Sequence, residues 1–406
     1  MSASRAFSST RLHALVFMCL VGTLMGCLKK APITETAPEA IAEVRYRYDA
    51  PTDQWNKRLV SEVVSGRWDR GLQRAVEGVL AASIRPGTRI PPSAARTLTA
   101  EAGYPGYAAF AQERNGGAWP DELVSQALIR KGQAPEVDVA IGQRRNADGT
   151  TLWVLAAAPK WGEIDPIVRD LTLDEPLPLR VDVPDVQSLA VYIAPPNGPV
   201  RTFSLTSGRL RWFDYFHLPG AHRIEVVDTS AGRAEVLFLF SVFVDVTPET
   251  LSGLPTALPR ADPLTATERL YQAVNILRTD AGLPALQRFG LFEPLAREHA
   301  AWMAQQGVVA HRLSGAPGVA QRAADQFRPR ARHTENVAAA YTAEEALQVV
   351  WDSPGHRKNL LCEQCSHISV GVALEPVLDR PPRLFVVWEL LEFPLGEPRA
   401  LPEYAR

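Results

Sequence analysis

The chain has 406 residues, of which 46% are apolar, and its formal net charge is −2 at neutral pH. This length suits two or three domains, and this apolar content lets each domain bury a core. The near-neutral charge lacks the positive excess of a nucleic-acid-binding protein, so no nucleic acid is expected as a partner. The 33 prolines indicate many turns and loops.

The N-terminus has the pattern of a signal peptide. Arg5 and Arg11 precede the apolar stretch "LHALVFMCLVGTLMGC", which is too short for an ordinary transmembrane helix. It ends in "LMGC", which resembles the lipobox of bacterial lipoproteins, whose cysteine is acylated. We expect residues 1–26 to be removed and Cys27 to anchor the protein to a membrane of the bacterial envelope, the outer membrane being favoured. An ordinary signal peptide is the alternative.

The region after the signal peptide divides into a stalk and a mixed α/β segment. Residues 28–45 lack aromatic residues and periodicity, which favours a flexible stalk over residues 27–47. In the N-terminal α/β domain expected over 48–165, "RGLQRAVEGVLAASI" has the apolar spacing of a helix. Further on, "VDVAIGQ" and "TLWVLAAA" flank the turn signal "NADGT" and predict two paired strands.

Residues 170–247 consist of short β-rich runs separated by proline and glycine turns, such as "LAVYIAP", "RTFSLT" and "AEVLFLFSVFVDV". This pattern predicts an antiparallel β-sandwich of immunoglobulin-like type, acting as a spacer or as a binding module. The proline-rich residues 248–264 are expected to be a linker.

The last domain is expected over residues 265–395, followed by a tail at 396–406. Helical patterns begin near residue 265, near residue 291 and after Thr342, and "SPG" predicts a further helix with Ser353 as its N-cap. The runs "HISVGVAL" and "RLFVVWELL" read as strands. Helices on both sides of such strands predict a three-layer α/β/α domain, so the whole chain is expected to be a multidomain α+β protein.

In this domain, the segments "LYQAVNILRTDAGLPAL", "LAREHAAWMA", "VVAHRL", "ENVA", "WDSPGHRKNLL", "ISVGVAL" and "FVVWELL" occur in order over about a third of the chain. Together they resemble the CAP superfamily of cysteine-rich secretory proteins, antigen 5 and pathogenesis-related 1, also called the SCP domain. The string Ser-x-Gly-His-Arg-x-Asn is typical of its bacterial branch. The resemblance implies an α/β/α sandwich and a secreted protein.

The resemblance also implies a cleft in which histidines and acidic residues converge. Position by position, it assigns His311 and His356 as the two histidines and Glu335 as the first glutamate. The second glutamate of eukaryotic members would fall at Pro354, so the fourth group is absent or is replaced by Asp352.

His356 has a physical argument of its own. It lies in the first turn of its predicted helix, where the positive end of the helix dipole disfavours imidazolium and keeps the ring neutral. Two neutral imidazoles and a carboxylate can form a three-ligand site for zinc or another divalent cation. A hydrogen-bonded polar cluster that only shapes the cleft remains an alternative. His299 reads as a core histidine, and His333 and His367 as surface or cap residues.

Cys362 and Cys365 are the two cysteines left after export and lipidation. In an oxidising compartment they are expected to form a short-loop disulfide. "HTE" at 333–335 followed by "CEQC" imitates the pattern of zinc nucleobase deaminases, but the proline that precedes the first cysteine there is missing.

Three classes of function stay open. The favoured one is a binding or interaction protein of the cell envelope, whose cleft holds a divalent metal or a lipid-like ligand, with an envelope polymer or a protein as other partners. The second is a metal-dependent hydrolase that uses His311, Glu335 and His356. The third is a scaffold with a vestigial cleft. No standard hydrolase or nucleotide motif is present, so an enzymatic activity stays open and is not the favoured alternative.

The N-terminal α/β domain echoes the C-terminal one. "VDVAIGQRRNADGTTLWVLAAAP" and "ISVGVALEPVLDRPPRLFVVWELLEFP" each read as a strand with a glycine, a turn, and a strand with a tryptophan. The N-terminal domain is therefore either a degenerate CAP-like copy or an unrelated α/β domain. Because the chain has no histidine between His13 and His217, such a copy is expected to lack the chemistry of the cleft.

Overall fold

A computed structural model describes most of the chain beyond its first forty residues. The described ranges are 41–82, 90–125, 134–230, 235–247, 262–312, 332–377 and 381–393. The signal peptide, Cys27, most of the linker and the C-terminal tail lie outside these ranges. Within them, no helix is both long and apolar enough to cross a membrane.

The N-terminal domain has a four-stranded sheet of order β2-β4-β5-β3. β2 and β4 are parallel, whereas β5 pairs antiparallel with both β4 and β3. The elements are α1 (Gln54–Glu62), β2 (Gly66–Trp68), α2 (Arg70–Ala81), α3 (Pro92–Glu101), β3 (Ala109–Asn115), β4 (Glu136–Arg145) and β5 (Thr151–Lys160). The expected β4–β5 hairpin is present, and the sheet also contains β2 and β3, for which the sequence held no clear signal.

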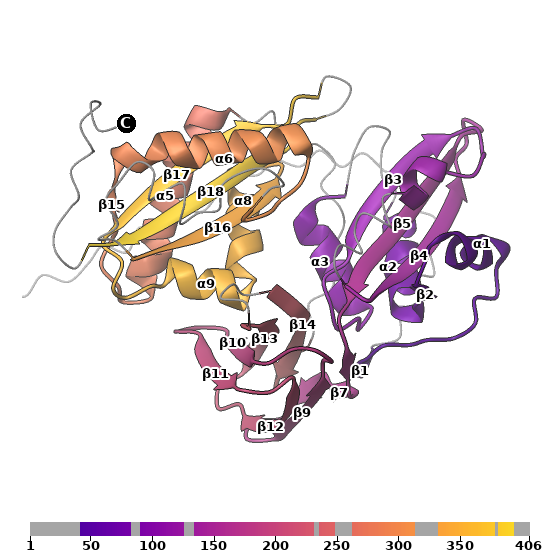
Figure 1. The fold of residues 1–406 in the computed structure, drawn as a ribbon, viewed down its shortest axis with the longest axis horizontal. Helices are drawn as coiled ribbons and strands as arrows, with labels where there is room; N and C mark the ends of the chain where they lie inside the picture. The colour runs from indigo at the N-terminus through magenta and orange to yellow at the C-terminus, as the bar shows by residue number, and fades with distance from the viewer. Residues whose placement is uncertain are drawn as a thin grey trace, which may run out of the picture. The chain divides into compact units, whose positions relative to one another are not determined.

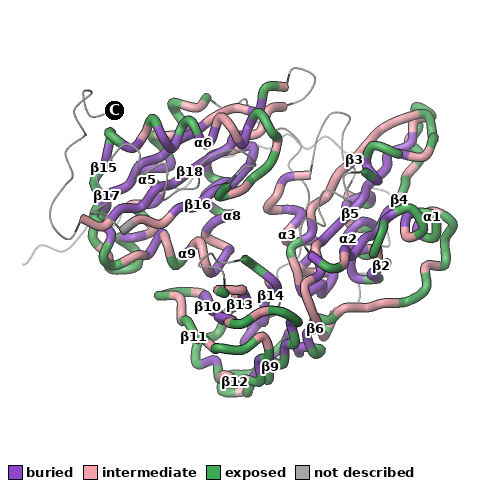
Figure 2. Tube along the Cα trace, in the orientation of Figure 1, coloured by how far each residue is buried: buried purple, intermediate pink, exposed green. Residues whose placement is uncertain are grey.

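Helices cover both faces of this sheet. One core joins α2 and α3 to alternate residues of the strands, among them Leu152 and Val154. The other joins α1 to the intervening residues, among them Trp153 and Leu155. Strands that are buried on both faces read as continuous apolar runs, which explains "TLWVLAAA". β5 is accordingly buried along almost its whole length, whereas β4 is buried in its first half only (Figure 2).

The folded body begins earlier than residue 48. β1 (Glu43–Val44) pairs antiparallel with β7 (Ile167–Val168), and Val44 is buried in the core of the next domain. The end of the expected stalk is therefore a strand, because the distant β7 pairs with it and its apolar residue is buried in the core of the next domain.

The β-sandwich consists of two sheets around one core. The sheet orders are β11-β10-β13-β14-β8 and β12-β9-β6. The strands are β6 (Glu163–Ile164), β8 (Asp170–Leu171), β9 (Pro176–Asp182), β10 (Leu189–Ala194), β11 (Arg201–Leu205), β12 (Arg209–Tyr215), β13 (Gly220–Asp228) and β14 (Glu235–Val244). The sandwich is not purely antiparallel, because β8 joins β14 in parallel. β6 also belongs to it, so its first strand precedes the expected start at residue 170.

The C-terminal domain has a four-stranded sheet of order β15-β17-β18-β16. Its elements are α5 (Pro263–Asp280), β15 (Gln287–Arg288), the 3-10 turn η1 (Gly290–Phe292), α6 (Glu293–Gln306), β16 (Arg332–Ala340), α8 (Ala343–Trp351), α9 (Pro354–Leu360), β17 (His367–Leu374) and β18 (Leu384–Glu392). α5, α8 and α9 share one core with the sheet, and α6 packs on its other face (Figure 1). The arrangement is a three-layer α/β/α domain.

Candidate histidine pair in the C-terminal domain

α9 is held against β16 by two buried or partly buried amides. Asn336 donates from Nδ2 to the backbone oxygen of His356 at 2.9 Å. Asn359 donates from Nδ2 to Oδ1 of Asn336, also at 2.9 Å. Asn336 is fully buried, so its side chain has one fixed place in the sheet. These bonds place His356 beside the strand that carries Glu335.

His311 follows α6, which ends at the left-handed Gly307. Its Nδ1 lies 2.8 Å from Oε1 of Glu335 on β16. The Glu335 side chain is 2% exposed, whereas the His311 side chain is 52% exposed. The buried Glu335 carboxylate can therefore accept a hydrogen bond from Nδ1–H of His311 and fix the orientation of its ring.

The rings of His311 and His356 lie close together, with their centroids 6.1 Å apart and their planes inclined by 43°. Burial, and then the positive charges of His311 and Arg96, lower the pKa of His356 to about 3. Its Nδ1 is buried and has no hydrogen-bond partner among the described residues. The expected neutral imidazole is thus explained mainly by burial, in addition to the helix position.

As a metal site, the cluster fits two ligands and not three. Among the residues described, no three His, Cys, Asp or Glu side chains are placed to hold one metal ion. Glu335 instead contacts Nδ1 of His311, which is the position of an orienting carboxylate behind a metal-binding histidine. A divalent cation would then be held by His311 and His356 with its other positions open.

The family comparison supports the resemblance found in the sequence. The family model described as "Cysteine-rich secretory protein family", with the short name CAP, matches residues 271–388. Residues 271–388 are a CAP domain. This match covers the C-terminal domain and leaves the two domains before it unassigned. No curated protein is significantly similar in sequence to the chain.

The solved structures that are similar to this chain include the following three. An outer surface protein from Borrelia burgdorferi is 20% identical, covering 33% of this chain and 98% of that one, with a TM-score of 0.28. An extracellular protein with an SCP domain from Bacillus anthracis is 20% identical over 42% of this chain and 57% of that one, with a TM-score of 0.28. A cysteine-rich secretory protein from Staphylococcus aureus is 11% identical over 57% and 86%, with a TM-score of 0.26.

Asp352 does not replace the missing fourth group of the CAP pattern. Its Oδ1 lies 2.9 Å from Nη2 of Arg223, on β13 of the β-sandwich, and accepts a bond from Gln348. Its carboxylate is thereby engaged by the neighbouring domain. The described acidic partner of the histidine pair is Glu335.

Two other histidines of the CAP domain, His299 and His367, lie in its interior. His299 is fully buried and its Nε2 lies 2.9 Å from the backbone oxygen of Ala310, as expected of a core histidine. His367 is only 6% exposed and packs against Phe289 and Phe393, so the expected surface or cap role is wrong. Its strand is covered by η1 and the last residues of the domain, which the sequence pattern did not reveal.

Cys362 and Cys365 form the expected disulfide, with 5.4 Å between their Cα atoms. It closes the turn between α9 and β17. Both sulfurs are consumed by this bond, so the two cysteines are not metal ligands and the deaminase pattern has no structural counterpart.

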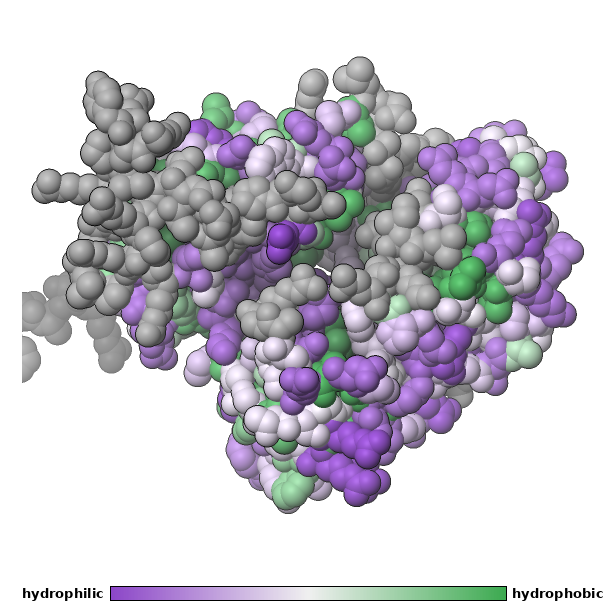
Figure 3. Space-filling view, viewed as in Figure 1, coloured by the Kyte–Doolittle hydropathy of each residue, from purple (hydrophilic) through white to green (hydrophobic). Residues whose placement is uncertain are grey.

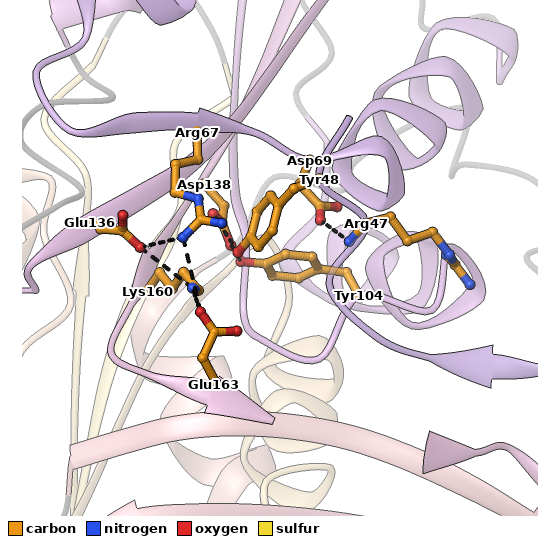
Figure 4. Close-up of polar contacts among 9 residues, drawn as sticks. All are labelled: Arg47, Tyr48, Arg67, Asp69, Tyr104, Glu136, Asp138, Lys160 and Glu163. Atoms are coloured by element: carbon orange, nitrogen blue, oxygen red, sulfur yellow. Dashed lines mark hydrogen bonds and ion pairs between the residues drawn. The ribbon is translucent and has the colours of Figure 1, made fainter. Parts of the chain in front are cut away.

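A buried polar cluster in the N-terminal domain was not anticipated (Figure 4). Asp138 on β4 is fully buried and accepts hydrogen bonds from the hydroxyls of Tyr48 at 3.0 Å and Tyr104 at 2.7 Å. Beside it, the buried Lys160 contacts Glu136 and Glu163. The signal was present as a lone acid in the apolar strand "VDVAIGQ", where burial requires hydrogen-bond partners.

This cluster predicts a pH-dependent stability. Burial raises the pKa of Asp138 to about 7, with Asp69 adding to the rise and Tyr104, Tyr48 and Lys160 opposing it. Since the folded pKa lies above the unfolded one, the stabilisation is fully present below about pH 4 and is lost as the pH rises through 7. The N-terminal domain should therefore unfold more readily at pH 8 than at pH 5.

Hydrogen exchange of the β4–β5 hairpin at these two pH values, corrected for intrinsic exchange, measures the effect. In Asp138→Asn the difference should largely disappear. An equal pH dependence in wild type and variant would show that another group is responsible.

On the face drawn in Figure 3, the described surface is mostly hydrophilic, and hydrophobic residues form small separate groups. A hollow of about 710 Å³ lies away from the histidine pair, and its lining includes Lys160, Trp161, Asp185 and Arg209.

Proposed function

We propose that this protein is an exported, lipid-anchored bacterial binding protein whose CAP domain binds its ligand at His311 and His356. The observation that carries the proposal is the pair itself. The His311 ring is oriented by a buried carboxylate and is half exposed, and the neutral His356 ring has a nitrogen with no hydrogen-bond partner among the described residues; the ring centroids lie 6.1 Å apart. Such a pair can bind a divalent cation, or a polar group of a lipid or envelope polymer, without any chemical step.

The pair favours binding over hydrolysis. In the alternative of a metal-dependent hydrolase, Glu335 would act as a metal ligand or as the general base for the attacking water. Glu335 is almost fully buried and engaged with His311, which suits a positioning role. When a divalent cation is bound, it would supply a positive centre for an anionic or polar ligand.

Zinc titration tests the proposal. Calorimetry on the full mature chain should show zinc binding that is lost, by a factor of at least about ten, in His311→Ala/His356→Ala, since each imidazole supplies one ligand. A suitable control is His217→Ala, which removes an exposed histidine of the β-sandwich paired with Asp174. Equal zinc affinity in wild type and the double variant would remove the proposed site.

The lipid anchor rests on the signal sequence and "LMGC" at residues 24–27. Cys27 would bind the protein to an envelope membrane through its acyl chains. Fractionation of cells that express Cys27→Ser tests this proposal. The variant should leave the membrane fraction, and an unchanged membrane-bound share would contradict the anchor.

We also propose that the N-terminal domain is a degenerate CAP-like copy. Its sheet β2-β4-β5-β3 has the order and strand directions of β15-β17-β18-β16. Trp153 packs in the core that contains α1, and Trp388 packs in the core that contains α5, the first helix of each domain. Gly142 and Gly371 lie against α2 and α6, the helix that follows the first strand of the sheet in each domain. With no histidine in its described residues, this copy would support the body and leave ligand binding to the CAP domain.

A further inference from the structure

The helix that carries His356 is shared between two domains. His356 and Asn359 face the CAP domain, where they meet His311 and Asn336. Other residues of the same short helix and its start contact the β-sandwich. This division means that the position of His356 depends on both domains.

Glu225 of β13 is the centre of the contact with the β-sandwich. It is 1% exposed, and its Oε1 accepts a hydrogen bond from Ser353 Oγ at 2.6 Å. Its Oε2 accepts one from the backbone N–H of Gly355 at 2.7 Å. The Ser353 side chain makes no capping hydrogen bond, so the expected N-cap bond is absent. Glu225, 128 residues earlier in the chain, accepts the backbone N–H of Gly355 in its place.

Flanking contacts fix the same helix from both sides. Arg357 is 4% exposed and donates from Nη1 to the backbone oxygen of Pro195 at 2.8 Å. The ammonium of Lys358 lies 4.8 Å from the ring centroid of Tyr192 on β10. The ion pair of Asp352 with Arg223 completes the set. The β-sandwich thus contacts the helix start, its middle and its exposed edge.

The electrostatics suit a carboxylate at this place. A helix N-terminus stabilises a negative charge and needs acceptors for its first N–H groups. Burial alone raises the pKa of Glu225, and the bonds from Ser353 and Gly355, followed by the charge of Arg96, oppose that rise. The lack of a side chain at Gly355 provides space for the Glu225 carboxylate, because a Cβ there would lie only 3.1 Å from Glu225 Oε2.

We propose that the β-sandwich is a positioning domain for the CAP histidine pair, with Glu225 as the residue that holds the start of α9 and thereby places His356 opposite His311. The expected effect on ligand binding rests on the proposed function, whereas the contacts that hold α9 do not depend on it. Glu225 touches no ligand and is a positioning residue. The sandwich then contributes to binding without belonging to the site.

The experiment uses the full mature chain with Glu225→Ala, Glu225→Gln and Asp165→Ala, the last removing an exposed carboxylate that lies 3.9 Å from Arg180. Hydrogen exchange of the α9 amides, Gly355 above all, is compared with that of β18. In Glu225→Ala the α9 amides should exchange at least about ten times faster while β18 is unchanged. Glu225→Gln should fall between, since its amide oxygen can replace one acceptor, and Asp165→Ala should match wild type.

Zinc calorimetry on the same variants links positioning to binding. Glu225→Ala should weaken zinc binding about tenfold, with Glu225→Gln intermediate. Unchanged α9 exchange in Glu225→Ala, or unchanged zinc affinity beside a loss in His311→Ala, would overturn the proposal. If wild type binds no zinc, the proposed metal site fails, and the exchange data alone decide whether Glu225 positions α9.

If Glu225→Ala does not fold, Ser353→Ala supplies the same test from the other side of the bond. It removes one of the two donors to Glu225 and leaves no buried cavity in the β-sandwich. Relative to wild type, the α9 amides of Ser353→Ala should again exchange faster, whereas the β18 amides should be unchanged. Wild-type exchange rates in α9 would refute the positioning role.

Discussion

Gly371→Ala should prevent the CAP domain from reaching its native fold. A Cβ at this position of β17 would lie 2.1 Å from the carbonyl carbon of Ala296 and 2.3 Å from the backbone nitrogen of Arg297, both in α6. Main-chain atoms cannot turn away as a flexible side chain can, so the whole helix would have to move off the sheet. We expect the domain to lose more than about 3 kcal/mol of stability.

Denaturant unfolding of the full chain, followed by near-UV circular dichroism, measures the change. Gly290→Ala is the matched control, because a Cβ there meets nothing within 4 Å. The control should unfold at the wild-type midpoint. A Gly371→Ala protein with a native spectrum and an unchanged midpoint would show that α6 does not pack this closely on the sheet.

Arg278→Met should destabilise the CAP domain by about 3 kcal/mol or more. Arg278 is fully buried in α5 and donates from Nη1 to the carbonyl oxygens of Leu360 at 2.8 Å and Cys362 at 2.9 Å. Its Nε donates to the carbonyl oxygen of Pro284 at 3.0 Å. Methionine keeps the apolar stem but leaves three acceptors without their donor. Because Leu360 is the last residue of α9 and Cys362 follows it closely, the amides of this helix should also exchange faster.

Arg269→Met is the control on the same helix. Its side chain is 62% exposed and pairs with Glu344 at 3.2 Å, so its loss should cost well under about 1 kcal/mol. Chemical denaturation of the three proteins compares them directly. If both variants lose the same small amount, the hydrogen bonds of Arg278 contribute little and the anchoring of α9 at its C-terminal end comes from packing.

The order and type of the main elements could be predicted from the sequence because their patterns are local. Apolar runs such as "TLWVLAAA" and "HISVGVAL" give strands buried on both faces, and the segments of the CAP pattern give the C-terminal domain. β1, β2 and β15 are only two or three residues long, and they exist because a distant strand offers a partner. No local pattern can reveal such pairing.

The candidate site shows the same division. His311, Glu335 and His356 were chosen by resemblance, and the structure brings His311 close to both of the others. The role of Glu335 behind His311 depends on its burial, which the sequence does not contain. The bond from Ser353 to Glu225 joins residues 128 positions apart, so a local reading assigns Ser353 to a cap instead.

The position of a bound cation tests the proposed role of His311 and His356 most directly. Crystals of the mature protein soaked in zinc, with data collected at the zinc absorption edge, locate the ion directly. We predict an anomalous peak between the rings of His311 and His356, with Glu335 bonded to His311 and outside the coordination sphere. A peak bound directly by Glu335, or zinc found only at other residues, would contradict it.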